Sequence, residues 1–367
     1  IIYLKLKTIY NVKTAKLLIS LTIALLFNGV VAAFLAPVVG LPVEGVFLAL
    51  TGLSLIPMPS GVAVMAIQKE IWINDIVANL FKANPHLNHA MNADQFVLAG
   101  KVVHIPNAGS KPNVERNRST LPATVLKRTD IDITFPLDEF TSDPILIPNA
   151  DKYELSYDKR MSVLSEQASA LAEDVGDWFF WYWAAVGAAN ITRTTGVATA
   201  AHYGTGNRRL ITLEDVKNIQ KLFNKNNIPQ DGRIAALDAD MMDQFTENLN
   251  VSQYRDFSAA YDAKTGTLGK LYSFTFLDPR STVLRYTNAA VPVVREPDSE
   301  AAATDNGGSL FWHKDSVIRA LGTNEMFEKI GDPTYYGDTY SALVRAGGRV
   351  RRNDHRGVIA LVQASIT

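Results

Sequence analysis

A long amphipathic segment in the middle of the chain is the feature that most constrains the fold. Its apolar residues recur at alternating steps of four and three, the spacing of one face of an α-helix. They are Tyr157, Met161, Leu164, Ala168, Leu171, Val175, Trp178 and Tyr182. No proline occurs between Pro148 and Pro229, so the sequence predicts one helix over 156–186, about 45 Å long. Globular helices average about 11 to 12 residues, so this helix is long enough to span a whole domain.

The end of this segment is unusually aromatic, because every residue of 178–183 is Trp, Phe or Tyr. Such a run could stack on nucleic-acid bases or enclose a cofactor. Aromatic residues at helical spacing are more often part of a core or an interface, and we prefer that interpretation.

The region after this helix mixes helices and strands. The sequence predicts helices over 212–226, 240–249 and 316–327, strands over 233–237, 269–276 and 357–364, and a surface loop over 296–308. Thr212 with Asp215 three residues later is close to a capping box. The elements do not alternate as β-α-β units, so the predicted class is α+β.

Before the long helix, residues 100–150 are predicted to be extended. The runs 102–106 and 130–135 have the composition of strands, and the second alternates strictly between polar and apolar residues. Charges in this region are sorted: 111–128 carries five basic residues and one Glu, whereas 129–143 carries five acidic residues and no basic one. The pattern predicts a long β-hairpin or arm with a basic and an acidic limb. The alternative is a solvated loop, although a loop of this length without a function is uncommon.

The N-terminal region differs sharply in composition from the rest. Residues 1–64 hold only five charged residues, which are Lys5, Lys7, Lys13, Lys16 and Glu44. Residues 17–36 are a candidate membrane span, while several prolines interrupt the apolar sequence after them. The alternative is an extended reading frame, because residue 1 is Ile and ordinary composition begins near Met65. We prefer this second interpretation, in which 1–64 is not part of the mature protein and the protein has no membrane partner.

The sequence shows no constellation that supports a catalytic proposal. The absence of cysteine excludes disulfides, thiolate metal sites and cysteine nucleophiles, and the net charge of −1 gives no long-range attraction to nucleic acid. His86 and His89 lack a third ligand nearby. Asp238, Asp240 and Asp243 follow a strand and are expected to cap the next helix, with Asp240 beginning it. We therefore expect no catalytic residue, no cofactor and no metal site.

A basic cluster lies near the end of the sequence. It consists of Arg345, Arg349, Arg351, Arg352 and Arg356. These residues could contact nucleic acid, or they could pair with acidic residues of a neighbouring chain. Asp354 lies inside the cluster, and we prefer the second interpretation.

The order of these elements resembles that of tailed-bacteriophage major capsid proteins, which have the Hong Kong ninety-seven-type fold. Local sequences also resemble this family, at 231–238 (DGRIAALD), 269–279 (GKLYSFTFLDP), 311–317 (FWHKDSV), 332–338 (DPTYYGD), 347–352 (GGRVRR) and 357–363 (GVIALVQ). The resemblance covers about 66–367, and residues 65–111 look most like capsid proteins of phages that infect Bacteroidetes, including the crAss-like group.

The resemblance implies a division into named parts. Residues 65–99 would be the N-terminal arm and 100–150 the extended loop. Residues 151–207 and 340–367 would form the peripheral domain with its spine helix, and 208–339 mainly the axial domain. We expect contacts between subunits at the basic and acidic limbs of the loop and at the arginine cluster. The candidate residues are Arg116, Arg118, Lys127, Arg128, Asp130, Asp132, Asp138, Glu139, Arg349, Arg351 and Arg352.

The implied function is self-assembly, without catalysis, into an icosahedral shell around double-stranded DNA. The implied partners are further copies of the chain in hexamers and pentamers, portal and scaffolding proteins, and packaged DNA through non-specific contacts. The implied location is the virion, assembled in the host bacterial cytoplasm. Two alternatives are an encapsulin-like compartment, which shares the fold, and a membrane-anchored protein that uses residues 17–36.

Overall fold

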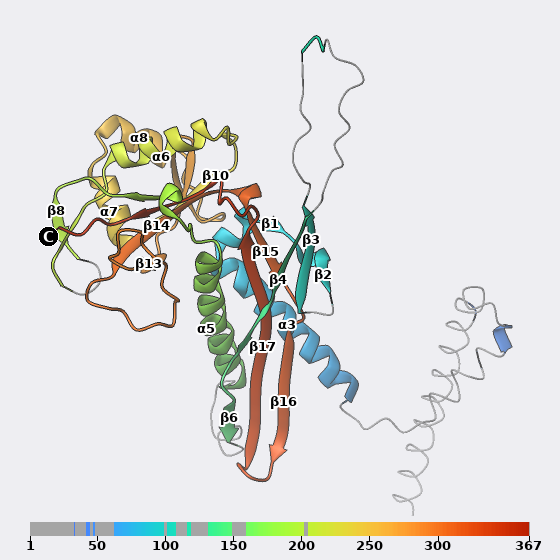
Figure 1. Cartoon of the computed structure of the whole chain (residues 1–367). Coiled ribbons are helices and arrows are strands. Elements are labelled where there is room, and N and C mark those ends of the chain that lie inside the picture. Colours follow the sequence, from blue (N-terminus) through green and yellow to red (C-terminus); the bar gives the residue numbers. More distant parts are fainter. Residues whose placement is uncertain are drawn as a thin grey trace, which may run out of the picture. The chain divides into compact units, whose positions relative to one another are not determined.

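The computed structural model describes residues 62–98, 101–107, 116–118, 131–148, 159–201 and 205–366, together with 33, 42–44 and 47 (Figure 1). The chain divides into two compact units, Ile1–Gln68 and Lys69–Thr367, and all sheets of the described residues lie in the second unit. The candidate membrane span at 17–36 lies outside the described residues, apart from residue 33. No helix in the described part of the chain is long and apolar enough to cross a membrane.

Helix α5 (Lys159–Tyr182) confirms the long helix expected from the sequence. Ala168, Leu171 and Val175 on its apolar seam are buried, and Leu164 is half-buried. The side chains of Tyr157 and Met161 lie outside the described residues. The helix ends at Tyr182 and not at residue 186, since the chain turns there and buries Trp183, Ala184 and Ala185 in the core beyond the helix end.

A mixed sheet lies beside α5, with its strands in the order β1-β15-β17-β16. Its strands are β1 (Met91–Asn92), β15 (Val317–Leu321), β16 (Glu325–Asp332) and β17 (Gly337–Val350). Two further short strands, β5 (Asp138–Thr141) and β6 (Ile145–Pro148), pair antiparallel with β17. The long strand β17 therefore pairs with four other strands of this sheet, β5, β6, β15 and β16, and lies next to α5 (Figure 1).

The helix predicted over 316–327 is wrong. A single turn of 3₁₀-helix, Lys314–Ser316, is followed by strands β15 and β16. Val317, Ile318 and Ala320 are buried because β15 lies inside the sheet, between β1 and β17. A short apolar run that is buried on both faces has no period that distinguishes a strand from a helix, and this ambiguity explains the error.

A second sheet forms the other half, with strands in the order β11-β12-β10-β14-β18-β7 and with β13 paired to β14 (Figure 1). Their bounds are β7 (Ile191–Arg193), β10 (Arg233–Ala236), β11 (Thr267–Leu271), β12 (Phe274–Leu277), β13 (Leu284–Tyr286), β14 (Asn306–His313) and β18 (Val358–Val362). The pairs β10–β12 and β18–β7 are parallel, and the others are antiparallel. This mixture of helices and strands confirms the predicted α+β class.

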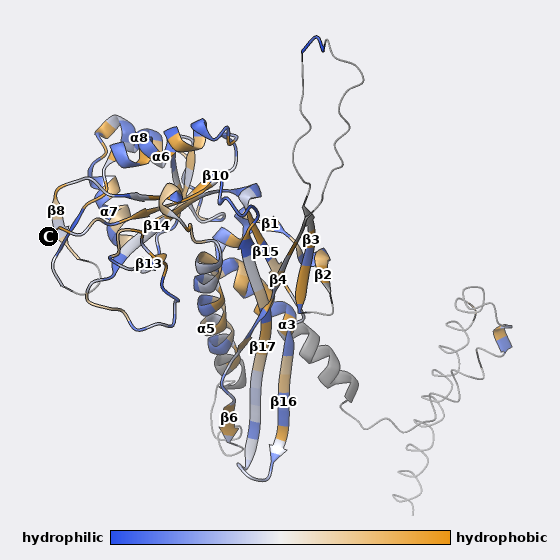
Figure 2. Cartoon of the chain, in the orientation of Figure 1, coloured by the Kyte–Doolittle hydropathy of each residue, from blue (hydrophilic) through white to orange (hydrophobic). Residues whose placement is uncertain are grey.

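Three helices contribute apolar residues to one core on this sheet, together with Phe274, Phe276 and Phe311 of its strands. They are α6 (Leu213–Lys225), α7 (Ala239–Glu247) and α8 (Val251–Ser258). Hydrophilic and hydrophobic residues alternate along α6 and α8 (Figure 2), as expected for helices with one buried face. The predicted strand over 233–237 and the closing strand over 357–364 are confirmed as β10 and β18.

Two local predictions in this half need correction and one is confirmed. The strand predicted over 269–276 is in fact a hairpin, because Tyr272 and Ser273 adopt positive φ of 49° and 67° and return the chain from β11 to β12. Helix α7 is capped by Asp238, whose side chain accepts a hydrogen bond from the amide of Met241, so Asp240 does not begin it. The capping box of Thr212 and Asp215 at the start of α6 is confirmed.

The N-terminal part of the second unit begins within helix α3 (Val62–Ala83). A 3₁₀-helix (Pro85–His89) follows it, and strands β2 (Val97–Leu98), β3 (Val102–Asn107) and β4 (Ile131–Pro136) form a small antiparallel sheet. The pair β8 (Ala198–Ala200) and β9 (Asn207–Arg209) completes the described strands.

Candidate functional site

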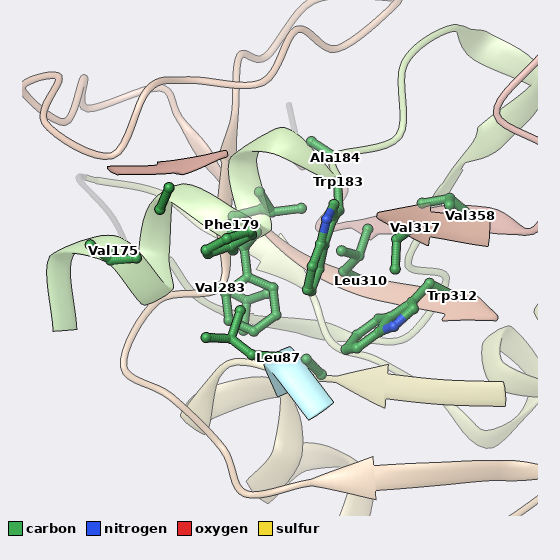
Figure 3. Close-up of a cluster of buried hydrophobic side chains, with 14 of the residues drawn as sticks. Leu87, Val175, Phe179, Trp183, Ala184, Val283, Leu310, Trp312, Val317 and Val358 are labelled. Carbon is green, nitrogen blue, oxygen red and sulfur yellow. The ribbon is translucent and has the colours of Figure 1, made fainter. Parts of the chain in front are cut away.

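The C-terminal end of α5 lies at a shared hydrophobic core, in which residues of both large sheets meet (Figure 3). Phe179, Phe180 and Trp183 are almost fully buried there, so the aromatic run belongs to the core, as the sequence predicted. Their partners from the two sheets include Leu310, Trp312, Val317 and Val358. The indole N–H groups of Trp183 and Trp312 donate hydrogen bonds of 2.9 Å to the carbonyl oxygens of Ile318 and His89. This shared core therefore connects the two large sheets through buried side chains of both.

The segment after α3 is attached to α5 by buried polar contacts. The amide of Asn84 donates to the carbonyl oxygen of Ala172 at 2.6 Å, and Nη1 of Arg280 donates to Oδ1 of Asn84 at 2.6 Å. Nη2 of the same arginine lies 2.9 Å from a carboxylate oxygen of Asp177. The ring of His86 stacks on Phe180 with centroids 4.1 Å apart. Burial and the positive charge of Arg280 lower the pKa of His86, so neutral imidazole is favoured at this position.

Strands β3 and β4 form the base of the predicted arm. They pair antiparallel, with Val103 opposite Phe135 and Ile105 opposite Ile133. All four side chains are buried, in a cluster that includes Ile318 and Ala320 of β15. The strict alternation seen in the sequence of β4 therefore marks a strand with one face on the core.

The structure places only some of the charged residues predicted on the arm. Arg116 is exposed and Arg118 is half-buried, and between them Asn117 adopts a positive φ of 52°. Asp132 lies in β4 opposite Pro106. The remaining limb residues, which are Lys127, Arg128 and Asp130, lie outside the described residues. Contact of these limbs with a neighbouring subunit stays a prediction.

Asp138 and Glu139 of strand β5 have partners inside the chain. The phenol of Tyr182 donates a hydrogen bond to the carboxylate of Asp138, and Nε of Arg345 lies 3.0 Å from Oε1 of Glu139. Burial raises the pKa of Tyr182, and the hydrogen bond to Asp138 adds to this shift. Glu139 and Arg345 are also directly opposite each other in the β5–β17 ladder. These contacts hold β5 against β17 and the end of α5.

The arginine cluster lies at and after the end of β17. The guanidinium of Arg349 donates to Oδ1 of Asn353 at 2.8 Å and to the carbonyl oxygen of Thr134 at 3.3 Å. Arg352 pairs with Asp354 at 2.9 Å, and this hydrogen bond lowers the pKa of the Asp354 carboxyl. Arg351 is exposed. Arg352 thus has an acidic partner within its own chain, whereas contact of this cluster with a neighbouring chain stays a prediction.

An exposed apolar surface was missed by the sequence analysis. It lies along β16 and the turn into β17, where the side chains of Phe327, Ile330, Tyr335 and Tyr336 are between 45% and 78% exposed. The helix wrongly predicted over 316–327 included Phe327, and the other three residues lie beyond it in a stretch without a regular alternation of polar and apolar residues. Exposed aromatic side chains grouped in this way are typical of a protein–protein contact.

The described residues offer no evident reaction centre. Among them, no three His, Asp or Glu side chains are close enough together to bind a metal ion. A cavity of about 180 Å³ lies between α3, α5, β16 and β17, with Trp72, Leu164, Gln167 and Met326 in its lining. Its walls are mainly apolar.

Comparisons with known proteins give a fold but no close relative. No protein-family model matches the sequence, and no curated protein matches it significantly. Solved structures do match. A chain from the capsid of Ralstonia phage GP4 covers 76% of this chain and 88% of its own, with 13% identity and a TM-score of 0.56. A chain from the capsid structure of the cyanophage P-SCSP1u covers 76% and 87%, with 19% identity and a TM-score of 0.53.

About three quarters of the chain is matched in each case. At such low identity they establish the shared arrangement of elements and no individual residue role. The chain has the α+β fold of tailed-phage major capsid proteins, the Hong Kong ninety-seven-type fold.

Proposed function

We propose that this chain is a structural protein that self-assembles into the icosahedral capsid shell around the double-stranded DNA genome of a tailed phage. The observation that carries the proposal is the match of 76% of the chain to a phage capsid protein at a TM-score of 0.56. A fold alone does not define a function, so the surfaces of the chain must also suit assembly.

Two features of the surface support assembly. The exposed apolar residues of β16 and the following turn need a partner to remove them from water. The base of the arm, strands β3 and β4, packs on β15, so the arm is firmly attached to the rest of the chain. The net charge of −1 suits a wall that lines packed DNA without binding it tightly.

The finer parts of the proposal concern organisation and partners. We assign 65–99 to an N-terminal arm, 100–150 to an extended loop, 151–207 and 340–367 to a peripheral domain, and 208–339 mainly to an axial domain. Subunits would form hexamers and pentamers in the host cytoplasm, with portal and scaffolding proteins as partners and without catalysis. The resemblance of residues 65–111 supports a phage that infects Bacteroidetes, including the crAss-like group.

Electron microscopy of the expressed protein tests the proposal, with and without candidate scaffolding protein from the same genome. The expected result is closed shells or rings of capsomer size. A monomer at high concentration, across a range of salt and with scaffold supplied, would contradict it. Shells that enclose a protein cargo, encoded beside the chain without terminase and portal genes, would instead indicate an encapsulin-like compartment.

A further inference from the structure

The cavity of about 180 Å³ between α3, α5, β16 and β17 is large for a protein interior. Its walls are mainly apolar, with Trp72, Leu164 and Met326 among them. Asp75 and Ala78 of α3 also lie in the lining, and both are exposed, so the cavity reaches the surface beside this helix. Protein interiors rarely leave voids of this size, because the atoms around an empty volume lose packing contacts. An occupant from outside the chain would restore those contacts.

One buried polar side chain in the lining lacks part of its hydrogen bonding. Gln167 is 7% exposed, and its amide nitrogen donates to the carbonyl oxygens of Asp143 and Tyr340 at 3.2 and 3.4 Å. These two acceptors fix the orientation of the amide, and its Oε1 has no hydrogen-bond partner among the described residues. A buried oxygen of this kind is rare and lowers stability until a donor reaches it. The cavity therefore favours an occupant that carries one donor.

The volume of the cavity limits the occupant to about one ring. A cavity of about 150 Å³ with aliphatic and aromatic walls binds benzene. The cavity here is slightly larger, and an aromatic ring packs well against indole and thioether groups such as those of Trp72 and Met326. A single aromatic ring with one hydroxyl group, which is a phenol, therefore matches both the volume and the unpaired oxygen of Gln167.

The chain itself carries phenol groups at the turn between β16 and β17. The side chains of Tyr335 and Tyr336 are 60% and 78% exposed, and the turn lies at the far end of this long hairpin (Figure 1). Tyr336 has a positive φ of 51°, a conformation that suits glycine or asparagine better than a bulky side chain. The ring is thus held out in water by a strained backbone, and strain of this kind is typical of residues with a function.

Tyr336 cannot fill the cavity of its own copy. The lining residue of β17 nearest to it in sequence is Ser341, and the extended strand between positions 336 and 341 spans about 16 Å. That distance is longer than a tyrosine side chain. Only another chain can bring this ring to the cavity.

We propose that Tyr336 of one copy inserts into the cavity of a neighbouring copy, with its hydroxyl donating a hydrogen bond to Oε1 of Gln167. The inference rests on the proposed self-assembly and names one contact by which it proceeds. The turn and the cavity are different surfaces, so the contact is heterologous, and every copy can give one ring and receive one. Buried tyrosines often dominate the energy of an interface, because they combine a large apolar area with a hydrogen bond.

A free phenolic compound is the competing source of the same ring. Its binding would need no second copy and would leave assembly independent of Tyr336. The experiment therefore tests the cavity and the tyrosine separately.

Binding of p-cresol, which is the side chain of tyrosine as a free molecule, tests the cavity. Titration of the full-length, unassembled protein by calorimetry should show one p-cresol bound per chain. Toluene, which lacks the hydroxyl, should bind about fivefold more weakly. Ala78→Phe places a ring at the mouth of the cavity and should abolish binding. Asn74→Phe adds the same ring at an exposed position of α3 outside the lining, and this control should bind p-cresol as the unchanged chain does.

Tyr336→Gly tests the tyrosine, because glycine also suits the positive φ at this position. The variant should be at least as stable in urea as the unchanged chain, yet it should need about tenfold more protein to assemble, as measured by light scattering and electron microscopy. Tyr336→Phe should lie between the two, since it keeps the ring and loses the hydroxyl. The control Tyr261→Ala removes another ring, which is 61% exposed, and should leave assembly unchanged.

Two further measurements connect the tyrosine to the cavity. Saturating p-cresol should inhibit assembly of the unchanged chain and have no further effect on the Tyr336→Gly variant. A photoreactive p-benzoylphenylalanine at position 336, in a mixture of isotopically light and heavy chains, should crosslink to Trp72 or Met326 of a different copy.

The failure of this contact can be told from the failure of the proposed function. If the unchanged chain forms neither rings nor shells, the proposed function fails. If the chain assembles but p-cresol does not bind, or if Tyr336→Gly assembles like the unchanged chain, the contact alone is overturned. Binding of p-cresol together with normal assembly of Tyr336→Gly would assign the cavity to a free phenolic compound.

Discussion

The indole N–H of Trp183 donates a hydrogen bond of 2.9 Å to the backbone carbonyl of Ile318, and so links the end of α5 to strand β15. Both residues are fully buried. Water cannot replace the missing partner if this bond is removed, so the bond has a larger effect on stability than an exposed one.

The first prediction compares two tryptophans of the same helix end. Trp183→Phe should lower the free energy of unfolding by about 2–4 kcal/mol, because it removes ring volume and leaves the Ile318 carbonyl unsatisfied. Trp181→Phe should cost less than about 1.5 kcal/mol, since the indole N–H of Trp181 has no acceptor among the described residues. Urea unfolding of the unassembled protein, followed by circular dichroism, measures both. Equal losses would show that the hydrogen bond does not matter.

Each apolar residue on the seam of α5 should contribute to the free energy of unfolding in proportion to how deeply its side chain is buried. Leu171→Ala should cost about 2–5 kcal/mol, because Leu171 is buried in the core. Leu164→Ala should cost less, since Leu164 is half-buried and already borders a cavity of about 180 Å³. The same unfolding measurement applies. A neutral result at Leu171 would contradict the packing of α5 described here.

Stability should fall in mild acid because of His86. Burial and the charge of Arg280 lower the pKa of His86 in the folded state, whereas the unfolded chain has the ordinary value of 6.5. Below pH 6.5 the unfolded state therefore binds a proton that the folded state does not. The free energy of unfolding should drop by up to about 1.4 kcal/mol per pH unit from this residue.

Unfolding between pH 7.5 and 5 measures this slope. His86→Gln should make it shallower, because the variant no longer carries the group whose pKa differs between the folded and unfolded states. Equal slopes in the original protein and in the His86 variant would mean that this histidine has the same pKa in the folded and unfolded states.

The charged arm should act between subunits. Arg116→Glu with Arg118→Glu should change the unfolding free energy by no more than about 1 kcal/mol, because Arg116 is exposed, Arg118 is half-buried, and charges near the surface contribute little within a folded monomer. Assembly should be impaired, since a small unfavourable contact recurs at every interface of a closed shell. Raised salt should slow assembly of the original protein as well. A variant that assembles normally but melts much earlier would make the arm an internal structural element.

Sequence reasoning was accurate where the signal is local. The seam of α5 repeats over many turns, and Thr212 with Asp215 forms a cap within four residues, so both helices were predicted close to their observed bounds. Strand β15 was missed, because its burial inside the sheet depends on β1 and β17, which lie elsewhere in the sequence. Nothing in the local sequence distinguishes such a run from a helix.

For the candidate assembly residues, too, the local pattern could be predicted from the sequence but their partners in the fold could not. Sorting of charge along the arm is visible in the sequence, but the pairing of Glu139 with Arg345 joins residues 206 positions apart. Asp138 likewise has its partner, Tyr182, on a different element. Long-range partners of this kind follow from the tertiary fold, and a list of charged residues cannot provide them.

Strand β18 lies in the interior of the second sheet, between β14 and β7, and all of its residues are buried. Residues 358–362 are made after every other strand of that sheet. Because synthesis proceeds from the N-terminus, the sheet has an open gap until residue 362 has left the ribosome. The interior position of this sheet is therefore filled by the strand that is synthesised last among its members, so the second half of the molecule closes only when β18 inserts between β14 and β7.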